Sequence, residues 1–409
     1  MCKTKANANT THRIESRMTQ SPDTPEVHPT ASAEHRETHQ IHTSEIRSFN
    51  GCRRRWDWAY RQGFVLDQAP KPLELGIAFH IGMEKFYDPE AWDSTSKEEK
   101  ASRAVVAFTE ECERQRAAFL KATNQERILV AEGDDYTERI DLGIGMIEHY
   151  ANYIHPVEDD WFRPVMTEVA FQVPLTDPRT GEPLRCFTPG THEGGCGQFH
   201  PVGALVTYDG RVDILIEDIA NGGYFVWDHK SAAQVQKSDH LIQMDPQVVG
   251  YSWALRTVLE LDIRGFIYAE YRKDYPKAPA LLKNTIKGRH FSTDKQQGTN
   301  LAVFLEHVKK YDFDAYQDGC YDEFIAWLKS KDGPVFHRRF PILKTPYELD
   351  QMGYNLSMEA SEMVRPSLPI YPAPGRFSCS GCGYYTPCNG KNRGEDYEYT
   401  LNSLYRKVK

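Results

Sequence analysis

The stretch that decides the fold runs from Gly210 to Ala232 and reads GRVDILIEDIANGGYFVWDHKSA. Apolar residues dominate on both sides of the NGG segment at 221–223, which indicates two strands joined by a tight turn. Side chains two apart in a strand share a face, so Asp228 and Lys230 project together. The turn predicts that the carboxylate of Asp213, in the first strand, lies beside that of Asp228.

This arrangement predicts a metal-dependent hydrolytic site. Two neighbouring carboxylates repel each other, and a divalent cation is the usual remedy. Phosphodiester hydrolysis needs such a cation to activate water and to offset charge on the phosphate, and a nearby ammonium can stabilise the same charge. Asp213, Asp228 and Lys230 supply these groups. By itself, however, a D-x-K strand is more often an ordinary exposed ion pair, so the surrounding sequence has to decide.

The surrounding sequence predicts an α/β core. Residues 44–155 show mostly helical periodicity, including a helical stretch from Pro72 to Tyr87. Period-two patterns predict strands at 165–173, at 202–207 and 211–217 around a turn at Asp209-Gly210, and at 264–271. Asp245 followed by Pro246 is typical of the cap and first turn of a helix, which we expect to end near Leu259.

The quoted stretch resembles the signature of RecB-type nucleases of the PD-(D/E)XK superfamily, in which a G-x-x-D strand precedes a D-x-K strand. The resemblance covers roughly residues 44–390. It extends to CRISPR-associated exonucleases, which are similar nucleases that carry an iron–sulfur cluster. It implies a restriction-endonuclease-like mixed β-sheet core flanked by helices. It also implies that Asp213 and Asp228 bind Mg²⁺ or Mn²⁺ and that Lys230 is catalytic.

Two further segments match the same pattern. The segment GIAFH, which ends at His80, resembles the helix that brings a histidine to the metal in these nucleases. The segment QVVGY resembles their Q-x-x-x-Y helix, and Gln247 and Tyr251 lie one helical turn apart, where both can reach a DNA strand near the metal. A nitrogen ligand makes manganese at least as suitable as magnesium. Glu168 stands where related nucleases often have a glutamate, and both a metal-site role and a solvated strand carboxylate stay open.

A cysteine group near the C-terminus has the spacing C-x₂-C-x₅-C, formed by Cys379, Cys382 and Cys388. The fourth ligand that such a site needs is expected to be Cys52, far upstream. This arrangement resembles the iron–sulfur nucleases, in which one cysteine precedes the nuclease core and three follow it, and it implies a 4Fe-4S cluster. A structural Zn²⁺ site with four cysteines is the alternative.

Two other sets of residues are weaker candidates for binding. Cys186, His192, Cys196 and His200 lie in one loop at spacings that suit zinc, although glycine-rich loops also carry unrelated Cys and His. For DNA binding, Arg53, Arg54 and Arg55 are interleaved with aromatic residues, a composition typical of strand-binding surfaces. A second basic stretch runs from Arg272 to Arg289. Basic residues beside aromatic ones also cover ordinary helices, so both readings of these stretches stay open.

The composition limits the class of protein. The chain has 409 residues, a formal net charge of -9 and 40% hydrophobic residues, so it is globular and any contact with nucleic acid must be local. Nine cysteines, unevenly clustered, favour free thiols and a metal site over a disulfide framework. No apolar run long enough for a membrane span or a signal peptide occurs, and we expect a cytoplasmic protein without a membrane partner.

These observations predict five segments: a disordered tail at 1–42, a helical region with Cys52 and His80 at 43–160, the nuclease core at 161–275, a mixed helical and basic region at 276–375, and the cysteine segment with a C-terminal tail at 376–409 that closes onto the helical region. The predicted function is a metal-dependent DNA nuclease, an exonuclease acting on single-stranded or end-containing DNA in recombination, repair or processing. The absence of a phosphate-binding loop suggests that the enzyme acts alone or beside a separate helicase or recombination partner. The alternatives are a non-catalytic DNA-binding or scaffold protein on the same fold, and a CRISPR adaptation nuclease that works with an integrase.

Overall fold

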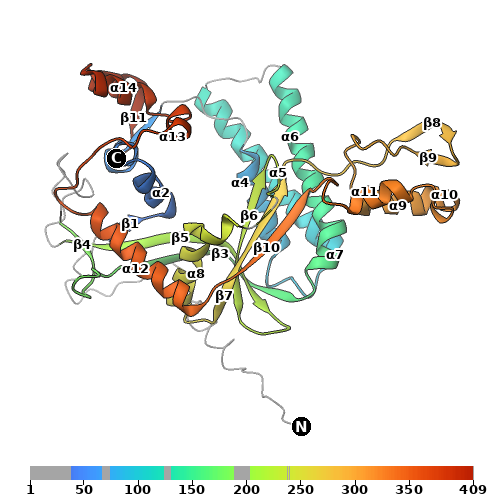
Figure 1. The fold of residues 1–409 in the computed structure, drawn as a ribbon, viewed down its shortest axis with the longest axis horizontal. Coiled ribbons are helices and arrows are strands. Elements are labelled where there is room, and N and C mark those ends of the chain that lie inside the picture. Colours follow the sequence, from blue (N-terminus) through green and yellow to red (C-terminus); the bar gives the residue numbers. More distant parts are fainter. Residues whose placement is uncertain are drawn as a thin grey trace, which may run out of the picture.

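The structure, a computed structural model, describes residues 38–66, 74–123, 130–187, 203–236, 238 and 240–408. Within these residues the central feature is a mixed sheet of seven strands with helices on both faces (Figure 1). The predicted restriction-endonuclease-like α/β architecture is therefore confirmed. None of the described helices has both the length and the apolar character needed to cross a bilayer.

The sheet has the strand order β1-β5-β6-β7-β10, and β3 and β4 also pair with β5. Neighbouring strands run antiparallel except for β1 beside β5 and β6 beside β7, which are parallel. Helix α8 makes the crossover that the parallel pair β6 and β7 requires. The strands of this sheet are β1 (Thr38–Ile41), β3 (Phe162–Pro174), β4 (Arg185–Cys186), β5 (Ala204–Asp218), β6 (Tyr224–Ala232), β7 (Ile263–Arg272) and β10 (His337–Leu343).

Two hydrophobic cores fill the space between the sheet and its helices. One core packs α2 (Thr43–Gly51), α8 (Pro246–Leu259) and α12 (Pro346–Met363) against the sheet. The other packs α4 (Leu75–Phe86), α5 (Lys97–Thr123) and α6 (Val130–His149) against the opposite face. Shorter helical segments complete this part: α3 (Arg53–Trp56), η1 (Asp57–Arg61), η2 (Tyr150–Ile154), α7 (His155–Glu158) and η3 (Ile242–Met244).

The start of α8 confirms the predicted cap. Pro246 occupies the first turn, and the side chain of Asp245 accepts a hydrogen bond from the backbone N–H of Gln247 at 2.8 Å. This cap fixes where the helix begins, and therefore where Gln247 and Tyr251 lie along it.

The turn predicted at Asp209-Gly210 is wrong, because β5 continues through both residues. The side chain of Asp209 accepts a hydrogen bond from Nε2 of Gln172, on the neighbouring strand, at 2.8 Å. A Cβ atom at position 210 would lie 2.4 Å from Cζ of Phe171. Gly210 therefore makes room for a packed ring rather than for a change of chain direction.

The sheet gathers strands from three separate stretches of the chain. Strands β1 and β10 lie outside the 161–275 segment in which we expected the nuclease core. The expected tail also differs from the structure at its end, because residues 38–41 form β1 and Ile41 is fully buried in the core. Residues 1–37 lie outside the described part of the chain.

A lobe is inserted between β7 and β10 and extends to one side of the sheet (Figure 1). It consists of a two-stranded hairpin and helices that enclose a small hydrophobic core of their own. Its elements are β8 (Leu281–Ile286), β9 (Arg289–Phe291), α9 (Leu301–Tyr311), α10 (Phe313–Gln317) and α11 (Asp322–Lys329).

The C-terminal segment returns to the N-terminal helical region. Strand β11 (Tyr405–Lys407) pairs antiparallel with β2 (Phe64–Leu66). The side chains of Trp58, Phe64, Leu401 and Tyr405 form a small buried cluster beneath this pair. The helices of this segment are α13 (Arg376–Ser380), α14 (Tyr385–Arg393) and α15 (Tyr397–Leu404). Two distant parts of the chain are thus held together here, as the sequence predicted.

Candidate metal-dependent active site

Four elements bring the predicted site residues together. Strand β5 carries Asp213, and β6 carries Asp228 and Lys230. The two strands form an antiparallel hairpin in which Ile214 pairs with Trp227, and the glycines at 222 and 223 adopt positive φ angles of 72° and 84° in the connecting turn. His80 comes from α4 on one side, and Gln247 and Tyr251 come from α8 on the other.

The polar side chains of this site make specific contacts. His80 Nδ1 lies 3.3 Å from Asp213 Oδ2. Lys230 Nζ lies 2.6 Å from Asp228 Oδ2, and Nε2 of Gln247 donates to Asp228 Oδ1 at 3.1 Å. The backbone N–H of His229 donates to Asp213 Oδ2 at 2.6 Å, which ties the first carboxylate to the strand of the second.

Burial makes the charges of the two carboxylates interact strongly. The Asp228 side chain is only 4% exposed, and burial together with the negative charge of Asp213 raises its pKa to about 6 despite the nearby ammonium of Lys230. Burial acts in the same sense on Asp213, but the hydrogen bond and charge of His80 outweigh it and lower the pKa of Asp213. The pair therefore stores electrostatic repulsion that a cation would relieve.

The two cationic side chains of the site, His80 and Lys230, have raised pKa values. Burial alone would lower the pKa of His80, but its contact with Asp213 raises it above its ordinary value. Burial also opposes the charge of Lys230, and the contact with Asp228 outweighs this and raises the pKa of the ammonium. Both side chains thus act as counter-ions to the two carboxylates.

Glu168 lies in β3 between Thr167 and Val169, which pair with Ile214 and Val212 on either side of Asp213. It is a non-glycine residue with a φ angle of 51° in the middle of a strand, a conformation that costs free energy and clusters at functional sites. Its carboxylate lies 3.2 Å from Arg211 Nη1. Burial and the negative charge of Asp213 raise the pKa of Glu168, so the carboxylates of Glu168 and Asp213 interact electrostatically.

The donor atoms of the site fit a divalent cation. Carboxylate oxygens suit Mg²⁺ and Mn²⁺, and the imidazole of His80 adds a nitrogen donor that favours Mn²⁺. Within the described residues, however, no three His, Cys, Asp or Glu side chains already converge on one point. Asp228 instead faces Lys230 and Gln247, and Asp213 faces His80 and the His229 N–H.

Tyr251 packs against the strands from the α8 side. Its ring lies 5.1 Å from that of Phe171 in an edge-on arrangement. Burial first, and then the negative charge of Asp228, raise the pKa of its hydroxyl. Gln247 and Tyr251 therefore border the same carboxylate from one helix face, as their spacing predicts.

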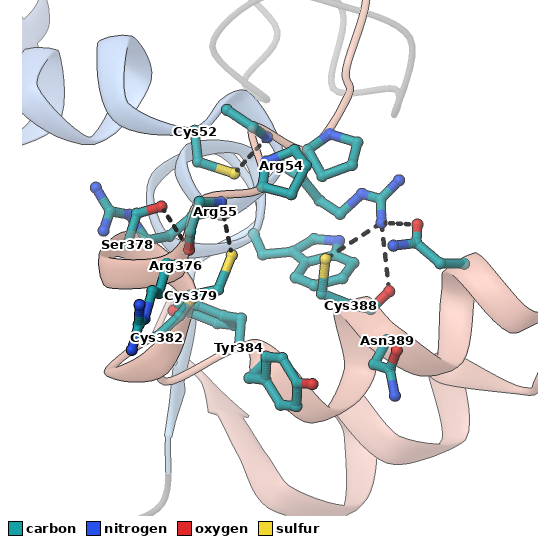
Figure 2. Close-up of a pocket in the computed structure, with 17 residues that line it drawn as sticks. Cys52, Arg54, Arg55, Arg376, Ser378, Cys379, Cys382, Tyr384, Cys388 and Asn389 are labelled. Carbon is teal, nitrogen blue, oxygen red and sulfur yellow. Dashed lines mark hydrogen bonds between the residues drawn. The ribbon is translucent and has the colours of Figure 1, made fainter.

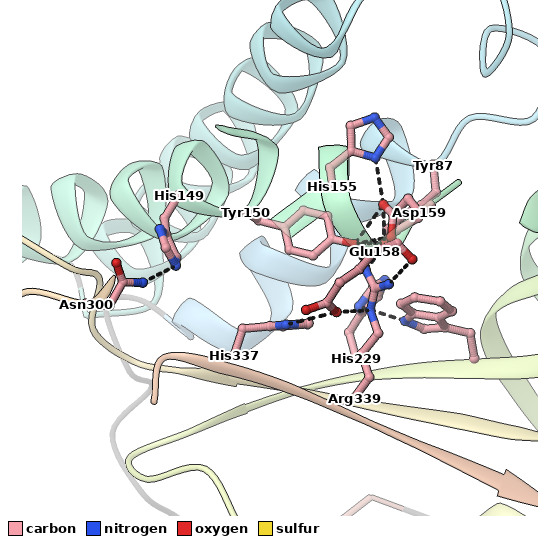
Figure 3. A network of polar contacts seen from close by, with 11 residues as sticks. Tyr87, His149, Tyr150, His155, Glu158, Asp159, His229, Asn300, His337 and Arg339 are labelled. Atoms are coloured by element: carbon pink, nitrogen blue, oxygen red, sulfur yellow. Dashed lines mark hydrogen bonds and ion pairs between the residues drawn. The ribbon is translucent and has the colours of Figure 1, made fainter. Parts of the chain in front are cut away.

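A buried polar network, which the sequence analysis missed, lies behind β6 (Figure 3). Arg339 forms an ion pair with Asp159, donates to the hydroxyl of Tyr150 and stacks 4.7 Å from the ring of Trp227. Trp227 in turn donates from Nε1 to Nδ1 of His229 at 3.2 Å. Burial lowers the pKa of His229 to about 3, so this imidazole is neutral. The network holds the face of β6 that is opposite Asp228 and Lys230.

The four predicted cluster cysteines line one cavity of about 470 Å³ (Figure 2). All four are free thiols, and they come from the α2–α3 junction and from the C-terminal segment: Cys52, Cys379, Cys382 and Cys388. Backbone N–H groups donate to two of the sulfur atoms, from Ala373 to Cys52 and from Gly375 to Cys379, each at 3.4 Å. Hydrogen bonds of this kind are typical of metal-bound thiolates.

The three arginines beside Cys52 do not form one exposed surface. Arg54 is buried, and its guanidinium donates to Cys388 Sγ at 3.3 Å and to Asn392 Oδ1 at 2.7 Å. Arg53 forms an ion pair with Glu362, and Arg55 donates to Ser48 Oγ at 3.3 Å. Arg54 thus belongs to the cysteine cavity rather than to the DNA-binding surface in which we expected it.

The loop with the second Cys and His set is mostly outside the described residues. Cys186 lies in β4 and is fully buried in the core of the sheet. The positions of His192, Cys196 and His200 are not among the described residues.

Comparison with known proteins identifies the family. A family model described as the PD-(D/E)XK nuclease superfamily matches residues 41–389. A search of the curated proteins found no match. The matched range contains every strand of the sheet except most of β1, together with both flanking helical layers and the acidic pair, and the chain therefore belongs to the PD-(D/E)XK nuclease superfamily.

Proposed function

We propose that this nuclease hydrolyses DNA phosphodiester bonds with the help of a divalent cation held by His80, Asp213 and Asp228. The observation that carries the proposal is the buried acidic pair on adjacent strands, with Lys230 Nζ 2.6 Å from Asp228. An ordinary exposed ion pair would not raise the pKa of one partner to about 6 through burial and a second carboxylate. Perturbed carboxylates of this kind are typical of active sites.

Each side chain has a separate role in the proposed reaction. A bound Mg²⁺ or Mn²⁺ ion would offset the negative charge of the phosphate and promote attack by water. Lys230 stabilises the charge that develops on the phosphate oxygens, because its ammonium stays protonated beside Asp228. Gln247 and Tyr251 orient the DNA strand, since both border Asp228 from α8.

We further propose that the enzyme acts on single-stranded or end-containing DNA, as an exonuclease in recombination, repair or processing. This part of the proposal rests on the likeness of the GRVD, DHK and QVVGY segments to those of RecB-type nucleases. Such nucleases are often joined to a motor, and this chain has no phosphate-binding loop. We propose that the nuclease works beside a separate helicase or recombination partner.

The cysteine cavity is proposed to hold a 4Fe-4S cluster. Four thiolates around one zinc ion lie about 2.3 Å from the metal and so must converge on a single point. In a four-iron cluster each thiolate binds a different iron, so the sulfur atoms stand further apart. The four cysteines line one cavity of about 470 Å³. The likeness of Cys52 and the C-x₂-C-x₅-C segment to the cysteines of iron–sulfur nucleases favours a cluster over the zinc alternative.

The test of the catalytic proposal is a cleavage assay on end-labelled single- and double-stranded DNA, with titration of Mg²⁺ and Mn²⁺. Asp228→Ala is expected to reduce the rate about a thousandfold or more, as removal of groups that act in the transition state does. Asp262→Ala serves as the matched control, because the Asp262 side chain is 67% exposed and forms a surface ion pair with Arg264. Wild-type protein that leaves DNA intact with both metals, or an Asp228→Ala variant as active as the control, would contradict the proposal.

A further inference from the structure

The inserted lobe carries a basic hairpin, formed by β8 and β9, on a chain that is acidic overall. Residues 281–291 include Lys283, Lys287 and Arg289 and no acidic residue. The whole protein has a formal net charge of -9. The hairpin is therefore a local positive feature, and local features are what an acidic protein must use to hold a polyanion.

The two lysines of this hairpin form no ion pair with any described residue. Lys283 and Lys287 are exposed, and neither forms an ion pair among the described residues. Arg289 is held in place instead, because it donates to Thr293 Oγ1 at 2.7 Å. Several other exposed basic residues form ion pairs with carboxylates, as Arg179 does with Asp177 at 2.7 Å. Within the described part of the chain, the hairpin thus presents two lysines that no carboxylate neutralises.

The tip of the hairpin has a strained lysine. Lys287 and Gly288 have φ angles of 50° and 78°, so the tip is a two-residue turn with positive φ at both central positions. Asn, Asp or Gly is the usual residue in such a turn, because a side chain with a Cβ atom is strained at positive φ. Strained residues of this kind are enriched at functional sites. Beside Lys287, the side chain of Ile286 is 49% exposed.

The base of the hairpin is anchored to the lobe. The backbone N–H of His290 donates to Asp312 Oδ2 at 2.8 Å, and that of Phe291 donates to the hydroxyl of Tyr321 at 3.1 Å. Phe291 itself is buried in the core of the lobe. The tip is thereby held out from a fixed base, away from the central sheet (Figure 1).

We propose that this hairpin is an arm that binds the phosphate backbone of the DNA beyond the cutting site. The inference rests on the proposed nuclease function for its substrate. Lys283 and Lys287 supply point charges for phosphates, and the exposed Ile286 offers an apolar contact to a sugar or base. Because the arm lies to the side of the sheet, it increases the affinity for long DNA and takes no part in the chemistry.

The experiment measures binding without cleavage. Fluorescence anisotropy in the absence of divalent metal compares a long DNA, about 30 base pairs or roughly 100 Å, with a strand of about 6 nucleotides. The variant Lys283→Glu/Lys287→Glu is expected to bind the long DNA tens of fold more weakly at 0.1 M salt, about eightfold for each lost phosphate contact. The slope of log affinity against log salt should fall by about two, while affinity for the short strand stays unchanged.

The matched control is Lys329→Glu/Lys331→Glu, which places the same charge change on exposed residues at the end of α11 in the same lobe. Equal weakening in both double variants, or wild-type affinity in the hairpin variant, would overturn the assignment. Thermal unfolding checks that each variant is folded, and Lys283→Gln/Lys287→Gln replaces the glutamate variant if that one fails to fold.

The two proposals can fail separately. If the wild-type protein binds long DNA through the hairpin but never cuts it, the arm stands and the nuclease function falls. If it cuts DNA and the hairpin variant binds and cuts long DNA as the wild type does, only the arm is refuted.

Discussion

Replacing Asp228 with asparagine should stabilise the metal-free protein while it abolishes nuclease activity. Asp228 is 3% exposed, and burial and the charge of Asp213 raise its pKa to about 6, from an ordinary value of 3.8. The charged form is therefore disfavoured in the folded state, and each pKa unit corresponds to about 1.4 kcal/mol. Because Asp228 and Asp213 titrate as a pair, we expect Asp228→Asn to gain on the order of 1–3 kcal/mol at pH 8.

The pH dependence of this gain has a definite sign. A carboxyl group whose pKa is raised by folding binds more protons in the folded state, so stability falls as pH rises between the unfolded and folded pKa values. The penalty is absent below about pH 4, grows between pH 4 and 6, and is complete above pH 6. The stability difference between Asp228→Asn and the wild type should therefore shrink as pH is lowered from 8 to 5.

The assay is urea unfolding in the presence of a chelator at several pH values, with Asp209→Asn as the control. Asp209, in β5, is a buried aspartate like Asp228. Its side chain, however, accepts a hydrogen bond from Gln172 and lies outside the acidic pair. A less stable Asp228→Asn protein at pH 8, or a difference that does not change with pH, would refute the reasoning. A gain of equal size in the control would also refute it.

Three other substitutions test separate parts of the structure. Lys230→Met should lower the cleavage rate at least about a hundredfold at saturating metal, while Lys230→Arg should retain more activity because it keeps the positive charge. Equal activity of the two variants would contradict the role of the ammonium. His80→Ala should raise the Mn²⁺ concentration required for activity by about 10–100-fold, and should raise the Mg²⁺ requirement less. An unchanged Mn²⁺ requirement would exclude His80 as a ligand. Cys388→Ser should remove the visible absorbance and the bound iron of anaerobically purified protein. It should also lower the free energy of unfolding by several kcal/mol, because the cluster closes a very long loop. An iron-free, zinc-loaded wild type would refute the cluster and leave the nuclease proposal intact.

The parts of the fold that the sequence predicted depend on local signals. The glycines at 222 and 223 specify a turn, and Asp245 with Pro246 specifies the start of α8, whatever the rest of the chain does. The strand and helix periods then determine which side chains share a face. These signals were enough to bring Asp213, Asp228, Lys230 and Gln247 to one site.

The parts that were missed depend on contacts between distant segments. Gly210 has the same local sequence signal as a turn glycine, and only the ring of Phe171, from β3, explains why β5 continues through it. Arg54 has the composition of a surface residue, but Cys388 and Asn392 from the C-terminal segment bury it. The network around Arg339 joins β10 to Asp159 and Trp227, and no local pattern predicts that partnership.

The most direct test of the central claim is anomalous diffraction from crystals of the protein soaked in Mn²⁺. We predict one manganese peak within coordination distance, about 2.0–2.3 Å, of carboxylate oxygens of both Asp213 and Asp228, with His80 Nδ1 or Nε2 turned toward the ion. Lys230 should then lie beside the ion without binding it. Manganese bound elsewhere, with the two carboxylates still engaged only by protein groups, would contradict the account.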